Sequence, residues 1–268
     1  MWSQHSQKIL SLALGILIIT VGCTDDPTSV NDSPPALPEA STMEMDFSNF
    51  ESQQTSNTIV QSSEHFARAV ITAAVLKTVV DFNLILPKAL LSAAQNADAE
   101  RNDDGTWEWS YSQTTNGNSF GVRLVAERDS EDSVDWNCYV TSPEQGVDDQ
   151  LFFSGTTSNE GQQGVWTYYD LQHNSSEEAV SEIDWNINDE ETSLRLEVIS
   201  DRNGFAGDYI EYNFDGTFKT AVYYASDEDE ETEIQINTDT KAGYIIAPNY
   251  NDGQQSCWDE SLQNVVCE

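Results

Sequence analysis

The pattern of apolar and polar positions divides the chain into one helical stretch and a much longer β region. Residues 64–97 are strongly apolar and poor in acid, and their polar residues, such as His65 and Arg68, recur three or four positions apart. A polar stripe this narrow is typical of a helix enclosed by protein. We therefore expect a buried apolar helical segment over residues 59–100, kinked or divided at Pro87, because proline cannot continue the hydrogen-bond ladder.

Two membrane interpretations compete with the buried helix. A membrane span needs about 20 apolar residues without charge, whereas Arg68, Lys77, Asp81 and Lys88 interrupt every such window. The other is an amphipathic helix that lies on a membrane surface. We take the buried helix as the leading interpretation and keep the surface helix as its alternative.

From Trp107 onward apolar and polar residues alternate, which is the two-residue period of β-strands. One face of each predicted strand is apolar and the other polar, as in an antiparallel sheet with one solvated face. Between the runs lie Asn116-Gly117, Asn203-Gly204 and Asp215-Gly216, which suit tight hairpins. The pattern predicts about eleven strands, connected as a meander, within residues 101–268.

Two local assignments depend on the same alternation. Phe218 and Val222 are placed on the dry face of their strand, with Lys219 on the wet face. Trp166 and Tyr168 remain ambiguous, and they are the aromatic residues that could face outward and bind a sugar.

A sheet of this size with one dry face must curl over something. We expect a mainly β protein with an N-terminal helix (α+β), in which a strongly curved sheet or incomplete barrel packs over the apolar helix. This layout is similar to the half-barrel-plus-helix fold of the envelope lipoprotein carriers and their outer-membrane receptor. The residues expected to line either a core or an apolar ligand site are Phe66, Val70, Leu76, Val80, Leu84, Trp107, Trp109, Trp136 and Trp185.

The first 22 residues have the features of an export signal, with Lys8 before an apolar run. Thr20-Val21-Gly22-Cys23 resembles the lipobox of bacterial lipoproteins. The resemblance implies cleavage before Cys23, lipidation of that cysteine and a place in the cell envelope. Thr24, rather than Asp, after the cysteine favours the outer membrane over the inner one. An ordinary signal peptide is the alternative.

The next segment is expected to hold the body away from the bilayer. Residues 23–58 are rich in proline and acid and are predicted to be a disordered tether. Within them, residues 42–50 suit either a short first strand or a segment that docks on the body. Residues 101–268 are expected to form a single domain with the helix.

Charge and cysteine content limit the partners. The 268 residues carry 47 acidic and 11 basic side chains, for a formal net charge of −36. Like-charge repulsion excludes nucleic acid and anionic lipid as partners of the body. Cys257 and Cys267 are close in sequence and are the expected disulfide, because closing a short loop costs little entropy. Cys138 is expected to be a buried small apolar residue.

Motifs for catalysis or metal binding are weak. Gly117-Asn118-Ser119-Phe120-Gly121 matches a nucleophile elbow, but a strand rather than a helix follows Ser119, and His173 is the only histidine downstream. The calcium-like run at Glu211 lacks the glutamate required at its twelfth position, Val222. We expect no catalytic residues, no metal and no cofactor. Outward carboxylate pairs leave a hydrolase as a remote alternative.

The sequence thus favours a membrane-tethered, non-catalytic lipoprotein that binds an apolar ligand under the helix. The alternative is a structural or interaction protein of the envelope, with the helix as permanent core. Its partners would be the membrane, through Cys23, and an apolar small molecule or an envelope protein.

Overall fold

The computed structural model describes residues 33–51, 64–130, 132–158, 160–171, 178–188 and 191–267. The predicted export signal, Cys23 with its lipobox-like sequence, and His173 lie outside these described residues. The body considered below is the unit Pro34–Glu268.

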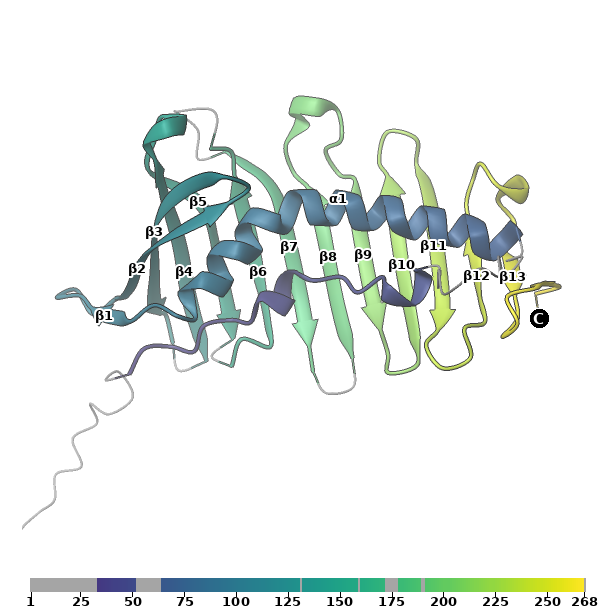
Figure 1. Ribbon diagram of the computed structural model, residues 1–268, viewed down its shortest axis with the longest axis horizontal. Coiled ribbons are helices and arrows are strands. Elements are labelled where there is room, and N and C mark those ends of the chain that lie inside the picture. Colours follow the sequence, from purple (N-terminus) through teal and green to yellow (C-terminus); the bar gives the residue numbers. More distant parts are fainter. Residues whose placement is uncertain are drawn as a thin grey trace, which may run out of the picture. The chain divides into compact units, whose positions relative to one another are not determined.

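The body is built on one antiparallel sheet whose strands follow each other in chain order (Figure 1). Each strand pairs with the next, and no pairing between β1 and β14 closes the sheet within the described ranges. The fold is therefore an open meander of fourteen strands. The strands are β1 (Ala99–Arg101), β2 (Trp107–Thr115), β3 (Asn118–Arg128), β4 (Ser133–Ser142), β5 (Val147–Ser158), β6 (Gln163–Tyr169), β7 (Ala179–Ile187), β8 (Thr192–Val198), β9 (Tyr209–Phe214), β10 (Phe218–Ala225), β11 (Glu230–Asn237), β12 (Gly243–Ile246), β13 (Ser256–Trp258) and β14 (Asn264–Val265).

The predicted antiparallel meander is confirmed, and the eleven expected strands correspond to β2 through β12. The three additional strands, β1, β13 and β14, lie at the two ends of the sheet and are two or three residues long. Strands this short show too little alternation to be recognised from sequence.

The predicted faces of β10 are wrong. Lys219 is buried at 6% exposure, whereas Phe218 is 37% exposed. The cause is the pairing with β9, where the buried Tyr212 lies opposite Ala221 and Phe214 lies opposite Lys219. Paired residues of neighbouring strands point to the same face, so Lys219 and Ala221 point inward, whereas Val222, opposite Glu211, points outward.

A single helix, α1 (Glu64–Ala94), crosses one face of the sheet (Figure 1). It begins near β13 and β14 and ends near β2, so it runs against the order of the strands. Pro87 lies inside the helix and is buried, and the helix continues through it to Ala94. The expectation of two separate helices is therefore wrong.

The segment before the helix belongs to the body. Two short 3-10 turns, η2 (Ala40–Met43) and η3 (Ser48–Phe50), lie beside α1, and the segment buries Met43, Met45, Phe47 and Phe50. The predicted disordered tether is therefore wrong for residues 34–51. Of the two alternatives for residues 42–50, the segment that docks on the body is confirmed. The rest of the predicted tether lies outside the described residues.

The core contains large rings that lie directly over glycines of the neighbouring strand. Gly164 pairs with Trp185, and a Cβ added at Gly164 would lie 2.6 Å from the Trp185 ring. Gly155 with Trp166 and Gly243 with Trp258 repeat the arrangement. Trp166 and Tyr168 are both buried, so neither is the outward sugar-binding ring that the sequence left open.

Candidate functional site

Two faces of α1 have opposite environments. The residues that face the sheet recur at intervals of three or four, which is the spacing of one helical stripe. We call these buried residues the inner stripe: Phe66, Ala69, Ala73, Leu76, Val80, Leu84, Pro87, Leu91 and Ala94. They belong to one hydrophobic core with the sheet.

The opposite face of α1 is also apolar, yet it is exposed. Ile71 is 57% exposed, Val75 57%, Val79 43%, Phe82 83% and Ile85 47%. We call these five residues the outer stripe. The prediction of a helix enclosed on all sides is therefore wrong, because nothing in the described body covers this face. By length and composition alone α1 could cross a membrane, and 28% of its most apolar window is buried.

The polar residues among the outer stripe are bonded within the helix itself. Thr78 Oγ1 donates to the carbonyl of Ala74 at 2.7 Å, and Asn83 Nδ2 donates to the carbonyl of Val79 at 2.7 Å. Lys77 Nζ forms an ion pair with Asp81 at 2.5 Å, which raises the pKa of Lys77. The four polar side chains between Val75 and Leu86 thus have partners on α1 itself.

The start of α1 is fastened to the last strands by polar contacts. The backbone N–H of His65 donates to Asn264 Oδ1 at 3.2 Å, so a residue from β14 occupies the place of a helix cap. His65 Nδ1 lies 2.6 Å from the Tyr250 hydroxyl, and Arg68 Nη2 donates to Asn249 Oδ1 at 2.8 Å. None of these contacts joins residues close in sequence.

The end of α1 is fastened to β2 and to the N-terminal segment. The Tyr111 hydroxyl donates to the carbonyl of Leu90 at 2.7 Å, and burial raises the pKa of Tyr111. Gln95 Nε2 donates to the carbonyl of Pro38 at 3.3 Å. Lys88 Nζ lies 3.5 Å from Glu44. Both ends of the helix are therefore held by specific contacts.

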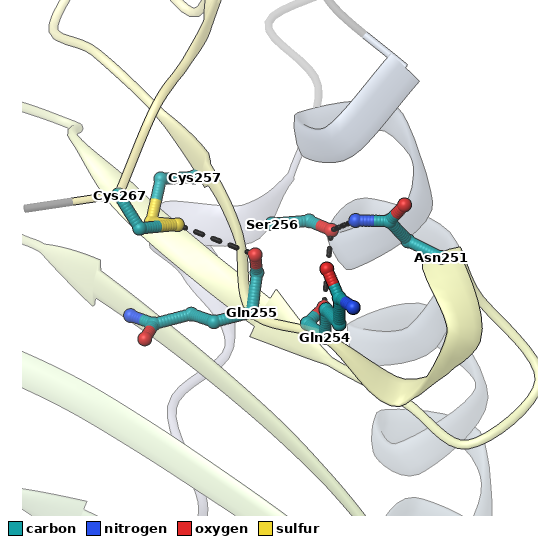
Figure 2. The surroundings of a disulfide bond; sticks show 6 residues. All are labelled: Asn251, Gln254, Gln255, Ser256, Cys257 and Cys267. Carbon is teal, nitrogen blue, oxygen red and sulfur yellow. Dashed lines mark hydrogen bonds between the residues drawn. A yellow bond between two sulfur atoms is a disulfide. The ribbon is translucent and has the colours of Figure 1, made fainter.

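A disulfide holds the strands that cap the start of α1 (Figure 2). Cys257 and Cys267 are bonded, with Cα atoms 5.3 Å apart, which is the pairing expected from their spacing. The Cys267 sulfur lies 3.3 Å from the carbonyl of Gln255. Cys138 is free and buried, and burial raises the pKa of its thiol.

The expected lining residues come together on the covered side of the sheet. Phe66, Leu76, Val80 and Leu84 from α1 are buried in the same core as three tryptophans, Trp109, Trp136 and Trp185. Val70 and Trp107 are half-buried and pack against that core. Side chains of the protein itself therefore fill the contact between helix and sheet.

The candidate catalytic serine lies in a hairpin. Asn116 and Gly117 have φ values of 52° and 82°, as a tight turn requires, and Ser119 lies in the strand that follows. His173, the histidine proposed with it, lies outside the described residues. Among the residues that the structure describes, no three His, Cys, Asp or Glu side chains gather as a metal site would require.

Three of the outward carboxylates are partners of arginines. Arg195 binds Glu197 at 3.0 Å and lies 3.7 Å from Glu211, and Arg123 lies 3.9 Å from Glu108. Two surface hollows, of about 540 and 420 Å³, lie at the β9–β10 turn and beside Arg123. No residue of α1 lines either hollow.

The fold and its contacts define an open antiparallel meander with one fastened helix, which leaves an apolar face uncovered. Comparison with protein-family models, with curated proteins and with solved structures finds no match for this chain.

Proposed function

We propose that this protein is a lipid-anchored, non-catalytic protein of the cell envelope, in which α1 is a permanent part of the core. The observation that supports it best is the filled contact between helix and sheet, where Leu84, Leu90 and Leu91 are at most 1% exposed. The anchor would be Cys23, through the lipobox-like Thr20-Val21-Gly22-Cys23. The outer membrane is the proposed location, as Thr24 favours.

Metabolic labelling with an alkyne fatty acid tests the anchor. The full chain is expected to incorporate label and to sediment with membranes. The Cys23→Ala variant should incorporate none, because the acylated sulfur is removed. Label retained by that variant, or an unlabelled parent chain, would contradict the proposed anchoring.

Hydrogen exchange tests whether α1 is permanent core. The amides of α1 should exchange in the same cooperative opening as those of β3 and β4, with a similar free energy. The reason is that the inner stripe is continuous with the core of the sheet. A helix that opens at much lower free energy than the sheet would contradict this part of the proposal.

A carrier of an apolar ligand is the second candidate, supported by the aromatic side chains of the covered face, such as Trp109, Trp136 and Trp185. It requires α1 to swing away from the sheet. A titration with a fluorescent fatty acid, together with mass spectrometry of an organic extract, separates the two. Saturable uptake or a copurifying lipid would favour the carrier over the permanent core.

A further inference from the structure

The outer stripe of α1 is a large apolar surface without a partner in the described body. Five apolar side chains from Ile71 to Ile85 are between 43% and 83% exposed. At a rise of about 1.5 Å per residue, they extend over roughly 20 Å of helix. Contiguous apolar surface of this kind marks an interaction site.

The internal bonding of the polar residues favours hydrocarbon over protein as the partner. Thr78 and Asn83 donate to carbonyls of their own helix, and Lys77 is neutralised by Asp81. A protein partner would be recognised in part through hydrogen bonds across the interface. The polar side chains of this face are already bonded within α1, so few donors or acceptors remain for a protein partner. A lipid interior, in contrast, requires that polar groups be satisfied internally.

Charge singles out the same face. The chain has a net charge of −36, but α1 carries three basic and two acidic side chains: Arg68, Lys77, Lys88, Glu64 and Asp81. The helix is therefore a nearly neutral strip on a strongly acidic protein. Two copies would repel each other, and so would an anionic membrane. A zwitterionic bilayer surface carries no such penalty.

The N-terminal segment makes the bilayer accessible. The described chain begins at Ser33, and Pro38 accepts a hydrogen bond from Gln95 just beyond the end of α1. Ser33 is ten positions after Cys23, and a chain of that length can reach at most about 35 Å. An anchor this close holds the helix at high effective concentration near the lipid, so even a weak apolar contact would be occupied.

We propose that the outer stripe of α1 docks on the surface of a zwitterionic bilayer, with Phe82 inserted at the boundary between headgroups and acyl chains. The protein would then lie on the membrane through α1 in addition to its acyl anchor. This inference rests on the proposed anchoring at Cys23, and the experiment below separates the two.

The experiment measures membrane depth at Phe82 in the acylated full-length protein. Phe82→Cys is labelled with a nitroxide, and the protein is reconstituted in phosphatidylcholine vesicles. The introduced thiol is selectively labelled, because Cys138 is buried and Cys257 is bonded to Cys267. Phe205→Cys is the matched control, since Phe205 is 56% exposed but lies outside α1.

Collisions with oxygen and with a water-soluble nickel chelate report the depth. At position 82, vesicles should raise the ratio of oxygen to nickel collisions severalfold, and at position 205 they should leave it unchanged. Equal, aqueous ratios at both positions on protein that still floats with vesicles would overturn the docking and leave the anchor standing. Protein that fails to float would instead count against the anchor.

A second measurement removes the stripe. In the unacylated mature chain with Cys23→Ala, Phe82→Ser should weaken binding to phosphatidylcholine vesicles about tenfold, from the lost transfer of one phenyl ring. Phe205→Ser should have no effect. Spin–spin broadening at position 82 without vesicles, with a dimer mass that Phe82→Ser abolishes, would overturn the proposal in favour of a second copy of this chain.

Discussion

The inner and outer stripes of α1 are both apolar, but the inner stripe is buried against the sheet and the outer stripe is exposed. Leu84 packs against the sheet at 1% exposure, and Phe82, two residues away, is 83% exposed. Packing on the sheet requires one apolar face, and the second contributes nothing to the described fold. This excess of apolar surface is the feature on which the proposed docking of α1 rests.

Truncating one residue on each stripe should give the largest difference between them in the free energy of unfolding. Leu84→Ala should lower the free energy of unfolding by about 2–5 kcal/mol, because it leaves a cavity in a filled core. Phe82→Ala should change it by less than about 0.5 kcal/mol, as an exposed substitution does. Urea denaturation of the unacylated chain measures both. Equal losses would mean that the outer stripe is covered in solution.

The sequence predicts the fold better than it predicts the surroundings of the helix. Alternation locates β2 to β12, because each strand has one wet and one dry face. The apolar circumference of α1 does not reveal which half the protein itself covers. Which half is covered depends on how far the sheet curves around the helix. Here the sheet covers one face of α1 and leaves the opposite face exposed.

Long-range contacts and hairpin register explain the remaining differences. The hydrogen bond from the His65 N–H to Asn264 joins residues separated by 199 positions, so no local sequence pattern predicts it. The inversion of β10 follows from its pairing with β9, where Tyr212 lies opposite Ala221 and Phe214 lies opposite Lys219, and alternation within β10 alone does not reveal it. The buried Lys219 was therefore missed as a contact of the N-terminal segment.

The disulfide holds the strands that cap the first turn of α1. Replacing Cys257 and Cys267 by serine should destabilise the protein by about 3 kcal/mol, the loop-closure entropy for a loop of roughly ten residues. Asn264 lies inside this loop and caps α1, so the amide of His65 should also lose protection from exchange.

Reduction provides the control for the disulfide. Dithiothreitol should lower the stability of the parent chain toward that of the double variant and should leave the variant unchanged. A loss of stability without faster exchange at His65 would show that the bridge acts on the strands alone.

The rings that support the inner stripe depend on glycine. Gly164→Ala should cost about 1–3 kcal/mol by overpacking, because its Cβ would lie 2.5 Å from the carbonyl of Thr156 and 2.6 Å from Trp185. Gly121→Ala is the matched control, since its nearest neighbour, in Thr141, is 3.7 Å away. Thermal unfolding compares the two, and a similar shift in both would mean that the rings move aside without cost.

The smallest expected effect concerns the segment beside α1. Asp46 forms an ion pair with Lys219 and accepts a hydrogen bond from the Ser48 N–H at 2.9 Å. Burial acts to raise the pKa of Asp46, but the hydrogen bonds from Lys219 and Ser48 outweigh it, so the pKa lies below the usual value of 3.8. The carboxylate therefore stabilises the folded state when it is ionised.

This stabilisation should be present at neutral pH and disappear as the pH falls through the lowered pKa. Asp46→Asn should cost about 1 kcal/mol at pH 7, a value limited by solvent screening at a side chain that is half exposed. The difference from the parent chain should persist down to about pH 4, near the pKa of the unfolded chain, and shrink below it. Asp239→Asn, in an exposed turn, is the control. If the difference in unfolding free energy grew on acidification, the protonated form of Asp46 would be the one that stabilises the folded state. The ion pair with Lys219 would then not be what holds residues 34–51 on the sheet.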